Sequence, residues 1–163
     1  MDFSNKRILI TGSSRGIGQA AARVFHDAGA MVATNGRTEV STQVGIDALG
    51  GGDRLFAAHG DVGIVQDCQD MIARAVEAMG GLDVLVNSAG VGDGATIEAS
   101  TEAMWDETIN VNLKGTFFCS QAAVPHLRKS GGNIVNVASD AGLIGEPGLS
   151  VYGASKGGVV NLT

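Results

Sequence analysis

The sequence predicts an α/β fold in which a doubly wound parallel sheet is covered by helices. Short apolar runs rich in β-branched residues alternate along the chain with stretches whose apolar residues recur at helical spacing. The links between them are rich in glycine, which supplies 25 of the 163 residues. This share is roughly twice the ordinary ~7% and indicates tight turns and close backbone approaches. We expect residues 1–163 to form a single domain.

The first strand–helix–strand unit shows this pattern most clearly. Arg7–Thr11 is a β-branched run that predicts a strand buried on both faces, and Met31–Asn35 predicts a second strand. Between them an apolar stripe at helical spacing predicts an amphipathic helix, with Ile17, Ala21, Val24, Phe25 and Ala28 on the stripe. Gly29 follows as a residue that ends the helix.

The same alternation continues along the rest of the chain. Three more strands are predicted, at Arg54–His59, Val84–Asn87 and Asn133–Ala138. Helices are predicted at Thr38–Leu49, from Cys68 to Met79, after a cap at Ser100 or Thr101, and over Leu113–Lys129. A last helix carries Tyr152 and Lys156.

The composition excludes several classes of partner. A net charge of −6 provides no electrostatic footprint for nucleic acid or for an anionic membrane. The longest run without charged residues, Gly115–Leu127, has 13 residues, which is too short for a membrane helix of ~20. Cys68, Cys119 and the three histidines show no metal-ligand spacing. We therefore expect a cytoplasmic protein with free thiols and no metal.

A glycine-rich turn joins the first strand to the first helix. Gly12, Gly16 and Gly18 give it the spacing G-x-x-x-G-x-G. Glycines let the backbone come close to a pyrophosphate, and the N–H groups at a helix start face the anion. A tight turn alone would also explain three glycines. Their position between a buried strand and an amphipathic helix favours a dinucleotide site.

Tyr152 and Lys156 are four residues apart, so on a helix they share one face. An ammonium close to a phenol stabilises the phenolate, and such a phenol can give or take a proton near neutral pH. This is the chemistry that reduction of a carbonyl needs. Because the same spacing arises by chance in ordinary helices, the catalytic interpretation of the pair depends on the glycine-rich turn earlier in the chain.

The candidate residues gather where the predicted strands end. Arg37 follows the second strand, Asp61 the third, Asn87–Gly90 the fourth and Ser139 the fifth. Ligands of doubly wound sheets bind outside the carboxyl ends of the strands. We therefore expect these residues and the glycine-rich turn to line one site.

Several motifs together resemble the short-chain dehydrogenase/reductase family; they are Thr11–Gly18, Asn87–Gly90, Asn112, Ser139, Tyr152 and Lys156. The resemblance covers the whole chain, in order. It implies a Rossmann fold and an oxidoreductase that moves a hydride between a nicotinamide cofactor and a carbonyl or secondary alcohol. The family usually has Asn-Asn-Ala-Gly in the second motif, so Ser88 is a mild departure.

The resemblance also implies which residues hold the cofactor. The glycine-rich turn would hold its phosphates, Asp61 would contact the adenine amino group, and Asn87 would steady the fourth strand. The cofactor-binding residues expected are Gly12, Ser14, Arg15, Gly16, Ile17, Gly18, Arg37, Asp61, Val62, Asn87, Ala89, Gly90, Tyr152 and Lys156.

Four residues would carry the reaction by this resemblance. Tyr152 would protonate the carbonyl oxygen or deprotonate the alcohol, and Ser139 would hydrogen-bond that oxygen. Lys156 would assist Tyr152 and bind the nicotinamide ribose, and Asn112 would hold a water that links Lys156 to solvent. The substrate would be a small molecule whose pocket is shaped in part by Asp140–Val151.

The end of the second strand addresses the choice of cofactor. An NAD site normally has an acid there, which binds the ribose 2′-OH. Gly36 stands at this position and leaves room for a larger group, while Arg37 offers a guanidinium matched to a phosphate. Arg15 can approach from the glycine-rich turn. Unless both arginines are ordinary surface residues, these features predict NADP(H) in preference to NAD(H).

Other interpretations stay open. We count five strands where a doubly wound dinucleotide fold commonly has six, so we expect the domain to be C-terminally incomplete. A cofactor-binding fragment or regulator without turnover is the first alternative. An epimerase or dehydratase on a related scaffold is the second, although those enzymes generally show T-G-x-x-G-x-x-G. The resemblance also implies a homodimer or homotetramer, joined through Leu113–Lys129 and the Tyr152 helix.

Overall fold

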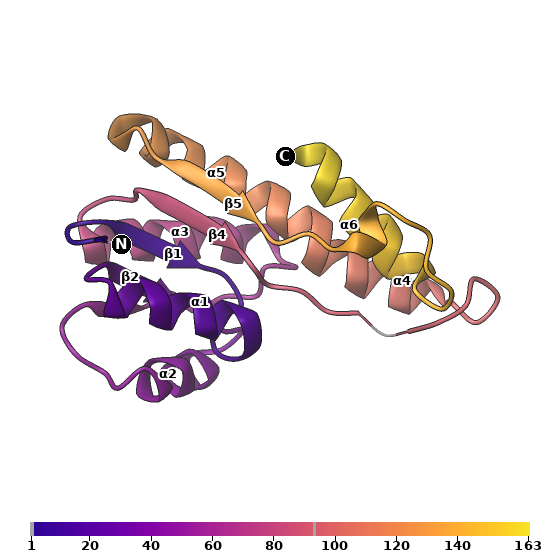
Figure 1. The fold of residues 1–163 in the computed structure, drawn as a ribbon, viewed down its shortest axis with the longest axis horizontal. Coiled ribbons are helices and arrows are strands. Elements are labelled where there is room, and N and C mark those ends of the chain that lie inside the picture. The colour runs from indigo at the N-terminus through magenta and orange to yellow at the C-terminus, as the bar shows by residue number, and fades with distance from the viewer. Residues whose placement is uncertain (1, 93) are drawn as a thin grey trace.

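The computed structural model describes residues 2–92 and 94–163, which form a parallel sheet in the order β3-β2-β1-β4-β5 (Figure 1). The strands are β1 (Arg7–Ile10), β2 (Met31–Thr34), β3 (Leu55–Ala57), β4 (Val84–Asn87) and β5 (Asn133–Asn136). Ile8 of β1 lies opposite Val32 of β2 and opposite Val84 of β4. Because the chain reverses its direction of travel across the sheet after β3, the predicted doubly wound topology is confirmed.

Helices connect the strands and cover both faces of the sheet. They are α1 (Gly16–Asp27), α2 (Glu39–Ala48), α3 (Val65–Met79), α4 (Glu102–Ile109), α5 (Gly115–Ser130) and α6 (Ser150–Leu162). A π-helical turn, Asn110–Lys114, joins α4 to α5, and a 3₁₀ turn, Asp140–Gly142, precedes α6. Figure 1 shows α1 and α2 on one face of the sheet and α3 and α5 on the other.

The core lies on both faces because neighbouring side chains of a strand point to opposite sides. Ile8 and Ile10 pack with residues of α1 and α2, whereas Leu9 packs with residues of α3 and α5. Cys68 and Cys119, far apart in the sequence, are both buried in this second cluster. A hydrogen bond to Cys68, together with burial, raises the pKa of the Cys119 thiol above its ordinary value.

β5 is shorter than predicted because its last residues serve the next helix. The strand ends at Asn136, before the predicted end at Ala138. The N–H of Val137 still bonds the carbonyl of Asn87, but the carbonyl of Val137 accepts a hydrogen bond from the Lys156 ammonium at 2.8 Å. The carbonyl of the first residue after β5 thus positions a side chain of α6.

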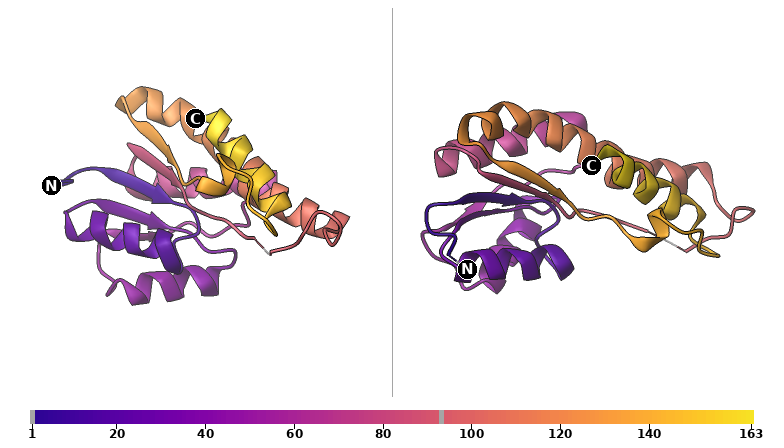
Figure 2. Two further views of the ribbon diagram at one scale, coloured as in Figure 1. Left: turned by 45° about the vertical axis from the view of Figure 1, so that its right-hand side comes forward. Right: turned by 45° about the horizontal axis from the view of Figure 1, so that its top comes forward.

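The part of the molecule beyond the strands is built from α4, α6 and two loops. Both views of Figure 2 show this part extending past the carboxyl ends of the sheet. An isolated bridge between Ala95 and Leu149 ties the loop after β4 to the segment before α6. Over the residues that the structure describes, no helix has both the length and the apolar character needed to cross a membrane.

Candidate active site

The glycine-rich turn after β1 is a point of close backbone packing. A methyl group added at Gly12 would lie 2.7 Å from Cα of Ala89, and one added at Gly18 would lie 2.6 Å from the carbonyl oxygen of Gly12. Gly12 and Gly16 both have positive φ, at 65° and 60°, which side chains rarely adopt. A methyl group added at Gly16, by contrast, would have no atom of the described residues within 4 Å, apart from those of its own neighbours in the chain. The turn is therefore packed on its inner side and open on its outer side.

The start of α1 faces this open side. Arg15 precedes the helix, and no side chain in the described part of the chain caps its first N–H groups. Arg15 and Ile17 are exposed, while Ser14 is half-buried. Uncapped N–H groups at the start of a helix form a favourable site for an anion, because they carry the positive end of the helix dipole.

A buried network that sequence reasoning missed supports the turn from below. The side-chain oxygen of Asn35 accepts from the N–H of Gly12 at 2.9 Å. Its amide nitrogen donates to the carbonyls of Ala58 and Gly60 at 2.9 and 3.1 Å, respectively. Asn35 therefore links the ends of β1, β2 and β3. The signal in the sequence was a polar residue at the end of an apolar strand.

Thr11 supports the turn from the side of β4. Its hydroxyl oxygen accepts from the N–H groups of Ser88 and Ala89 at 3.0 and 3.1 Å. The loop that carries Ala89 and Gly90 is thus fixed against the glycine-rich turn. Thr11 is itself buried, so this link is shielded from water.

The residues after β2 and β3 line the adjacent edge. Arg37 is exposed, Asp61 is half-buried and Val62 is buried. One carboxylate oxygen of Asp61 accepts from the N–H of Gly63 at 2.9 Å, which closes a local turn. The expected free space at Gly36 is not found, because a side-chain carbon there would collide with the hydroxyl of Ser41. α2 begins so close to Gly36 that its backbone and Ser41 fill the volume.

Asn87, at the end of β4, joins three elements of the sheet and its covering layer. Its amide nitrogen donates to Ser120 of α5 at 3.0 Å and to Asn136 of β5 at 2.9 Å. Its side-chain oxygen is buried and lacks a hydrogen-bond partner among the described residues. The contacts place Asn87 where it steadies β4 against β5.

Asn112 lies in the π-helical turn between α4 and α5, which includes the first two residues of the helix predicted over Leu113–Lys129. Its amide bonds both backbone groups of Val91 at 2.8 Å, and its nitrogen also donates to Ser155 of α6 at 3.0 Å. Ser155 in turn donates to the carbonyl of Tyr152 at 2.7 Å. The side chain of Asn112 thus holds the loop after β4 against the helix that carries Tyr152. Extra-wide turns of this kind are frequent at functional sites.

Tyr152 and Lys156 lie on one face of α6, as the spacing predicted. The Lys156 nitrogen is 5.7 Å from the centre of the Tyr152 ring and donates to the carbonyl of Val137. Lys156 is only 5% exposed, and burial lowers its pKa below the ordinary value. The Tyr152 ring packs so closely on Gly92 that a methyl group there would lie 2.6 Å from it. The pair is therefore held by the segment after β5 on one side and by the loop after β4 on the other.

Ser139 begins the 3₁₀ turn between β5 and α6. Its hydroxyl donates to the carboxylate of Asp140 at 3.0 Å and accepts from the N–H of Ala141 at 3.3 Å. It stands two residues after Val137, whose carbonyl holds Lys156. The short link from Val137 brings Ser139 to the end of the sheet where Tyr152 and Lys156 lie.

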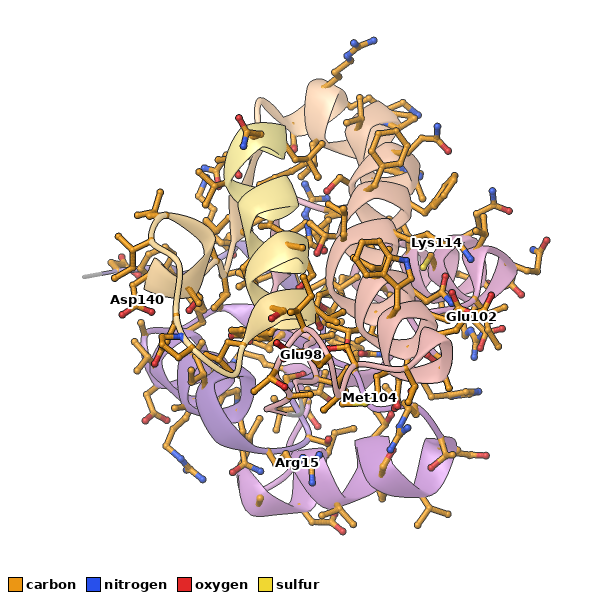
Figure 3. The ribbon with its side chains drawn as sticks, turned by 90° about the vertical axis from the view of Figure 1, so that its right-hand side faces the viewer. Arg15, Glu98, Glu102, Met104, Lys114 and Asp140 are labelled. Atoms are coloured by element: carbon orange, nitrogen blue, oxygen red, sulfur yellow. The ribbon has the colours of Figure 1, made fainter. Side chains whose placement is uncertain are left out.

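A cavity of about 360 Å³ opens next to the 3₁₀ turn, and Ser139, Tyr152 and Lys156 are not among the residues that line it. It lies between the segment Ala141–Glu146 and the first turn of α6, including Gly153 and Ala154. Figure 3 looks onto this end of the molecule, with Asp140 to one side of α6 and Glu98 beside its near end. The candidate residues follow the carboxyl ends of the five strands, which lie side by side in the parallel sheet. Among residues 2–92 and 94–163, no group of three or more metal-ligating side chains is found.

Solved and curated proteins resemble the chain over nearly all of its length. A crystal structure of a Sinorhizobium meliloti 1021 protein assigned to the short-chain alcohol dehydrogenases matches 99% of the chain and 65% of its own, with a TM-score of 0.91 and 41% identity. Meso-2,3-butanediol dehydrogenase of Serratia marcescens is 41% identical over 100% of this chain and 64% of its own length. Subunit BbsD of (2S)-[(R)-hydroxy(phenyl)methyl]succinyl-CoA dehydrogenase from Thauera aromatica is 39% identical over 100% and 66%.

The chain thus spans about two thirds of the length of these proteins. The model of one family, described as short chain dehydrogenase, matches residues 6–163. The fold, the glycine-rich turn and this match agree, and the chain belongs to the short-chain dehydrogenase family.

Proposed function

We propose that this protein is an oxidoreductase that transfers a hydride between NADP(H) and a carbonyl compound or secondary alcohol. The observation that carries the proposal is the placement of Tyr152 and Lys156 on one face of α6, with the Lys156 nitrogen held by Val137 at 2.8 Å. The pair lies on the helix whose start borders a cavity, at the same end of the strands as a glycine-rich turn with an open outer side.

The residues around the glycine-rich turn fit a dinucleotide. The open space at Gly16 and the uncapped start of α1 suit a pyrophosphate, whose charge the helix dipole would stabilise. Asp61, Val62, Ala89 and Gly90 would line the adenosine side. When bound, the nicotinamide would supply or accept the hydride. The protein's own contribution is to orient it and to move the proton.

Tyr152 would move that proton. In the direction of reduction its hydroxyl would donate to the carbonyl oxygen as the alcohol forms, with the Lys156 ammonium stabilising the phenolate left behind. Ser139 would give the same oxygen a second hydrogen bond, and to do so it must turn its hydroxyl away from Asp140. Asn112 would act through Val91 and Ser155 by keeping α6 in place.

Assembly and location complete the proposal. Trp105 and Phe117, on the α4 and α5 side, are 48% and 42% exposed and offer apolar area to a second copy. We propose a homodimer or homotetramer that uses this side, in the cytoplasm, where Cys68 and Cys119 would stay reduced. Light scattering at micromolar concentration tests the assembly, and a monomer there would contradict it.

The proposed reaction is tested by mixing the purified chain with NADPH and a panel of ketones and following the loss of NADPH absorbance. We expect turnover with at least one ketone and none without it. Binding of NADPH with no turnover across the panel would favour a cofactor-binding regulator or inactive fragment instead. A parallel titration of NADPH by intrinsic fluorescence separates these outcomes, because it reports cofactor binding alone.

A further inference from the structure

Within the oxidoreductase function proposed above, on which this inference rests, we infer that Asp67 is a positioning residue that sets the preference for a cofactor whose nucleobase carries an amino group. Asp67 lies in the first turn of α3. It acts through Asp61, in the segment that joins β3 to α3, rather than by touching the cofactor. Three features lead to this: the hydrogen bonds that fix Asp61, the one carboxylate oxygen that they leave over, and the close fit of Asp67 against the chain.

Asp61 is held by hydrogen bonds at its N–H, its carbonyl and one carboxylate oxygen. The N–H donates to a carboxylate oxygen of Asp67 at 2.9 Å, and the carbonyl accepts from the N–H of Ile64 at 3.0 Å. The Oδ1 atom accepts from the N–H of Gly63 at 2.9 Å. The Oδ2 atom has no hydrogen-bond or ion-pair partner among residues 2–92 and 94–163. Half-buried Asp61 therefore keeps one oxygen for a ligand.

Asp61 is also tied to the glycine-rich turn through Asn35. Asn35 accepts from the N–H of Gly12 at 2.9 Å and donates to the carbonyl of Gly60 at 3.1 Å. Gly60 directly precedes Asp61, so a single buried side chain joins the phosphate side of the proposed cofactor site to the segment that carries Asp61. A ligand held at the turn would thus have Asp61 at a fixed place beside it.

The free oxygen of Asp61 determines which nucleobase fits. A carboxylate oxygen accepts hydrogen bonds and cannot donate them, so it favours a group that carries N–H. Adenine has an amino group at C6, whereas hypoxanthine has a carbonyl oxygen at the same carbon. Two acceptors that face each other leave the buried oxygen without a donor, and sites of this kind reject an analogue that lacks the N–H.

Asp67 decides where that oxygen points. α3 follows Ile64 without a side-chain cap, and the Asp67 carboxylate reaches back to Asp61. A side-chain carbon added at Gly60 would lie 3.2 Å from the carbonyl oxygen of Asp67 and 3.4 Å from its Cβ, so Asp67 fits closely against the chain. A hydrogen bond to a carboxylate is roughly twice as strong as one between neutral groups. Without it the N–H of Asp61 would lose its partner, and the segment would be free to turn the Asp61 side chain.

The dissociation constants of two cofactors test the inference. NADPH and reduced nicotinamide hypoxanthine dinucleotide phosphate differ only at the nucleobase, and nicotinamide fluorescence reports the binding of both. The parent chain should bind NADPH at least tenfold more tightly. Asp67→Ala should reduce this ratio below threefold, mainly by weakening the binding of NADPH. A ratio near one in the parent would overturn the inference, and so would an equal loss of affinity for both cofactors in the variant, because that loss would reflect a purely structural role.

Three further variants separate the hydrogen bond from charge and from folding. Asp67→Asn removes the charge but keeps an acceptor, and its ratio should stay above fivefold. Asp70→Ala removes the charge of an exposed residue of the same helix and should leave the ratio unchanged. Gly60→Ala crowds Asp67 from the other side and should lower the ratio at least twofold, even if Asp67→Ala does not fold. An unchanged ratio in Gly60→Ala, or equal changes in Asp67→Ala and Asp70→Ala, would contradict the role of Asp67.

The titrations also separate this inference from the proposed reaction, because they report binding alone. Tighter binding of NADPH than of the hypoxanthine cofactor, with no turnover of any ketone, would overturn the reaction and leave the role of Asp67 standing. Turnover by a parent chain that binds both cofactors equally would overturn the role of Asp67 alone. Binding of neither cofactor would overturn both.

Discussion

The two halves of the candidate site differ in the groups that form them. The cofactor half is the glycine-rich turn with the ends of β1 and β2, and the substrate half is the end of β5 with α6. Beside β1 and β2 the glycine-rich turn is held by backbone groups and by two buried polar side chains, Thr11 and Asn35. Beside β5 and α6 the site depends on the side chains of Tyr152, Lys156 and Ser139. Three of the four residues in β1 and in β2 are buried, whereas no residue of β5 is.

This contrast indicates how each half responds to change. The cofactor half is over-determined, since a shift of the turn would break several buried contacts at once. In the substrate half, by contrast, the Lys156 ammonium has one hydrogen-bond partner among the described residues, the Val137 carbonyl. We therefore expect substitutions in the cofactor half to act on folding and cofactor affinity, and those in the substrate half to act on turnover.

The largest effect should come from Tyr152→Phe in the substrate half. The substitution removes only the oxygen that would carry the proton and keeps the ring that packs on Gly92. Positioned acid–base catalysis is typically worth 10²–10⁴-fold, so kcat should fall by about that factor. The dissociation constant of NADPH should stay within about threefold. A variant that keeps more than a tenth of the parent kcat would remove Tyr152 from this role.

The next effect compares two glycines of the cofactor half. Gly12→Ala adds a methyl group 2.7 Å from Ala89 at a position with φ of 65°, so both a clash and backbone strain oppose it. We expect a loss of about 3 kcal/mol in the free energy of unfolding. Gly16→Ala meets strain alone, because open space surrounds it, and should lose about 1 kcal/mol. Urea denaturation measures both, and equal losses would show that close packing at Gly12 is unimportant.

A third effect should leave both halves of the site untouched. Asp83 accepts two side-chain bonds from Arg7, at 2.8 and 3.0 Å, at the end of β4 remote from the site. Hydrogen bonds from Arg7 hold the pKa of Asp83 below its ordinary 3.8, so its stabilisation is present above that pH and is lost as the pH falls through the lower folded value. Asp83→Asn should lower the free energy of unfolding by about 2 kcal/mol at pH 7.

Thermal unfolding between pH 2.5 and 7 tests this account of Asp83. The difference between parent and variant should be constant above pH 5 and should narrow below pH 3.8. Cofactor affinity, measured at pH 7, serves as the control and should not change. A difference that persists undiminished at the lowest pH would show that the ion pair with Arg7 is not the source.

Features of the fold that depend on local pattern were predictable from the sequence. The positions of the strands and the glycine-rich turn follow from alternation, β-branched runs and glycine spacing, because these patterns reflect burial and backbone geometry residue by residue. Tyr152 and Lys156 were brought together by a helical spacing that the structure reproduces. Backbone hydrogen bonding and periodicity are enough to predict these features without knowledge of the tertiary contacts.

Features that depend on which elements meet were not predictable in this way. In the sequence Asn35 is only the last residue of a predicted strand. Its role depends on contacts with the segments after β1 and β3, which the sequence pattern does not describe. The bond from Ser139 to Asp140 depends on the local turn, which periodicity does not describe. At Gly36 the absence of a side chain was taken as free space, but the structure fills that space with Ser41. A glycine can mark a place where other protein atoms approach the backbone closely, as well as a place with room for a ligand.

The smallest effect concerns Arg37 and the choice of cofactor. Without free space at Gly36, preference for a 2′-phosphate has to come from charge, and Arg37 and Arg15 are exposed where they can supply it. A charge-assisted bond of ~1.5–3 kcal/mol predicts NADPH over NADH by at least tenfold. Arg37→Asp should abolish that preference, since a carboxylate repels the phosphate and accepts from a ribose 2′-OH. Arg128→Asp makes the same change of charge at the exposed end of α5 and should leave the ratio of the two dissociation constants unchanged. Equal affinities in the parent, or a ratio that Arg37→Asp does not move, would mean that specificity for the phosphate lies elsewhere in the site.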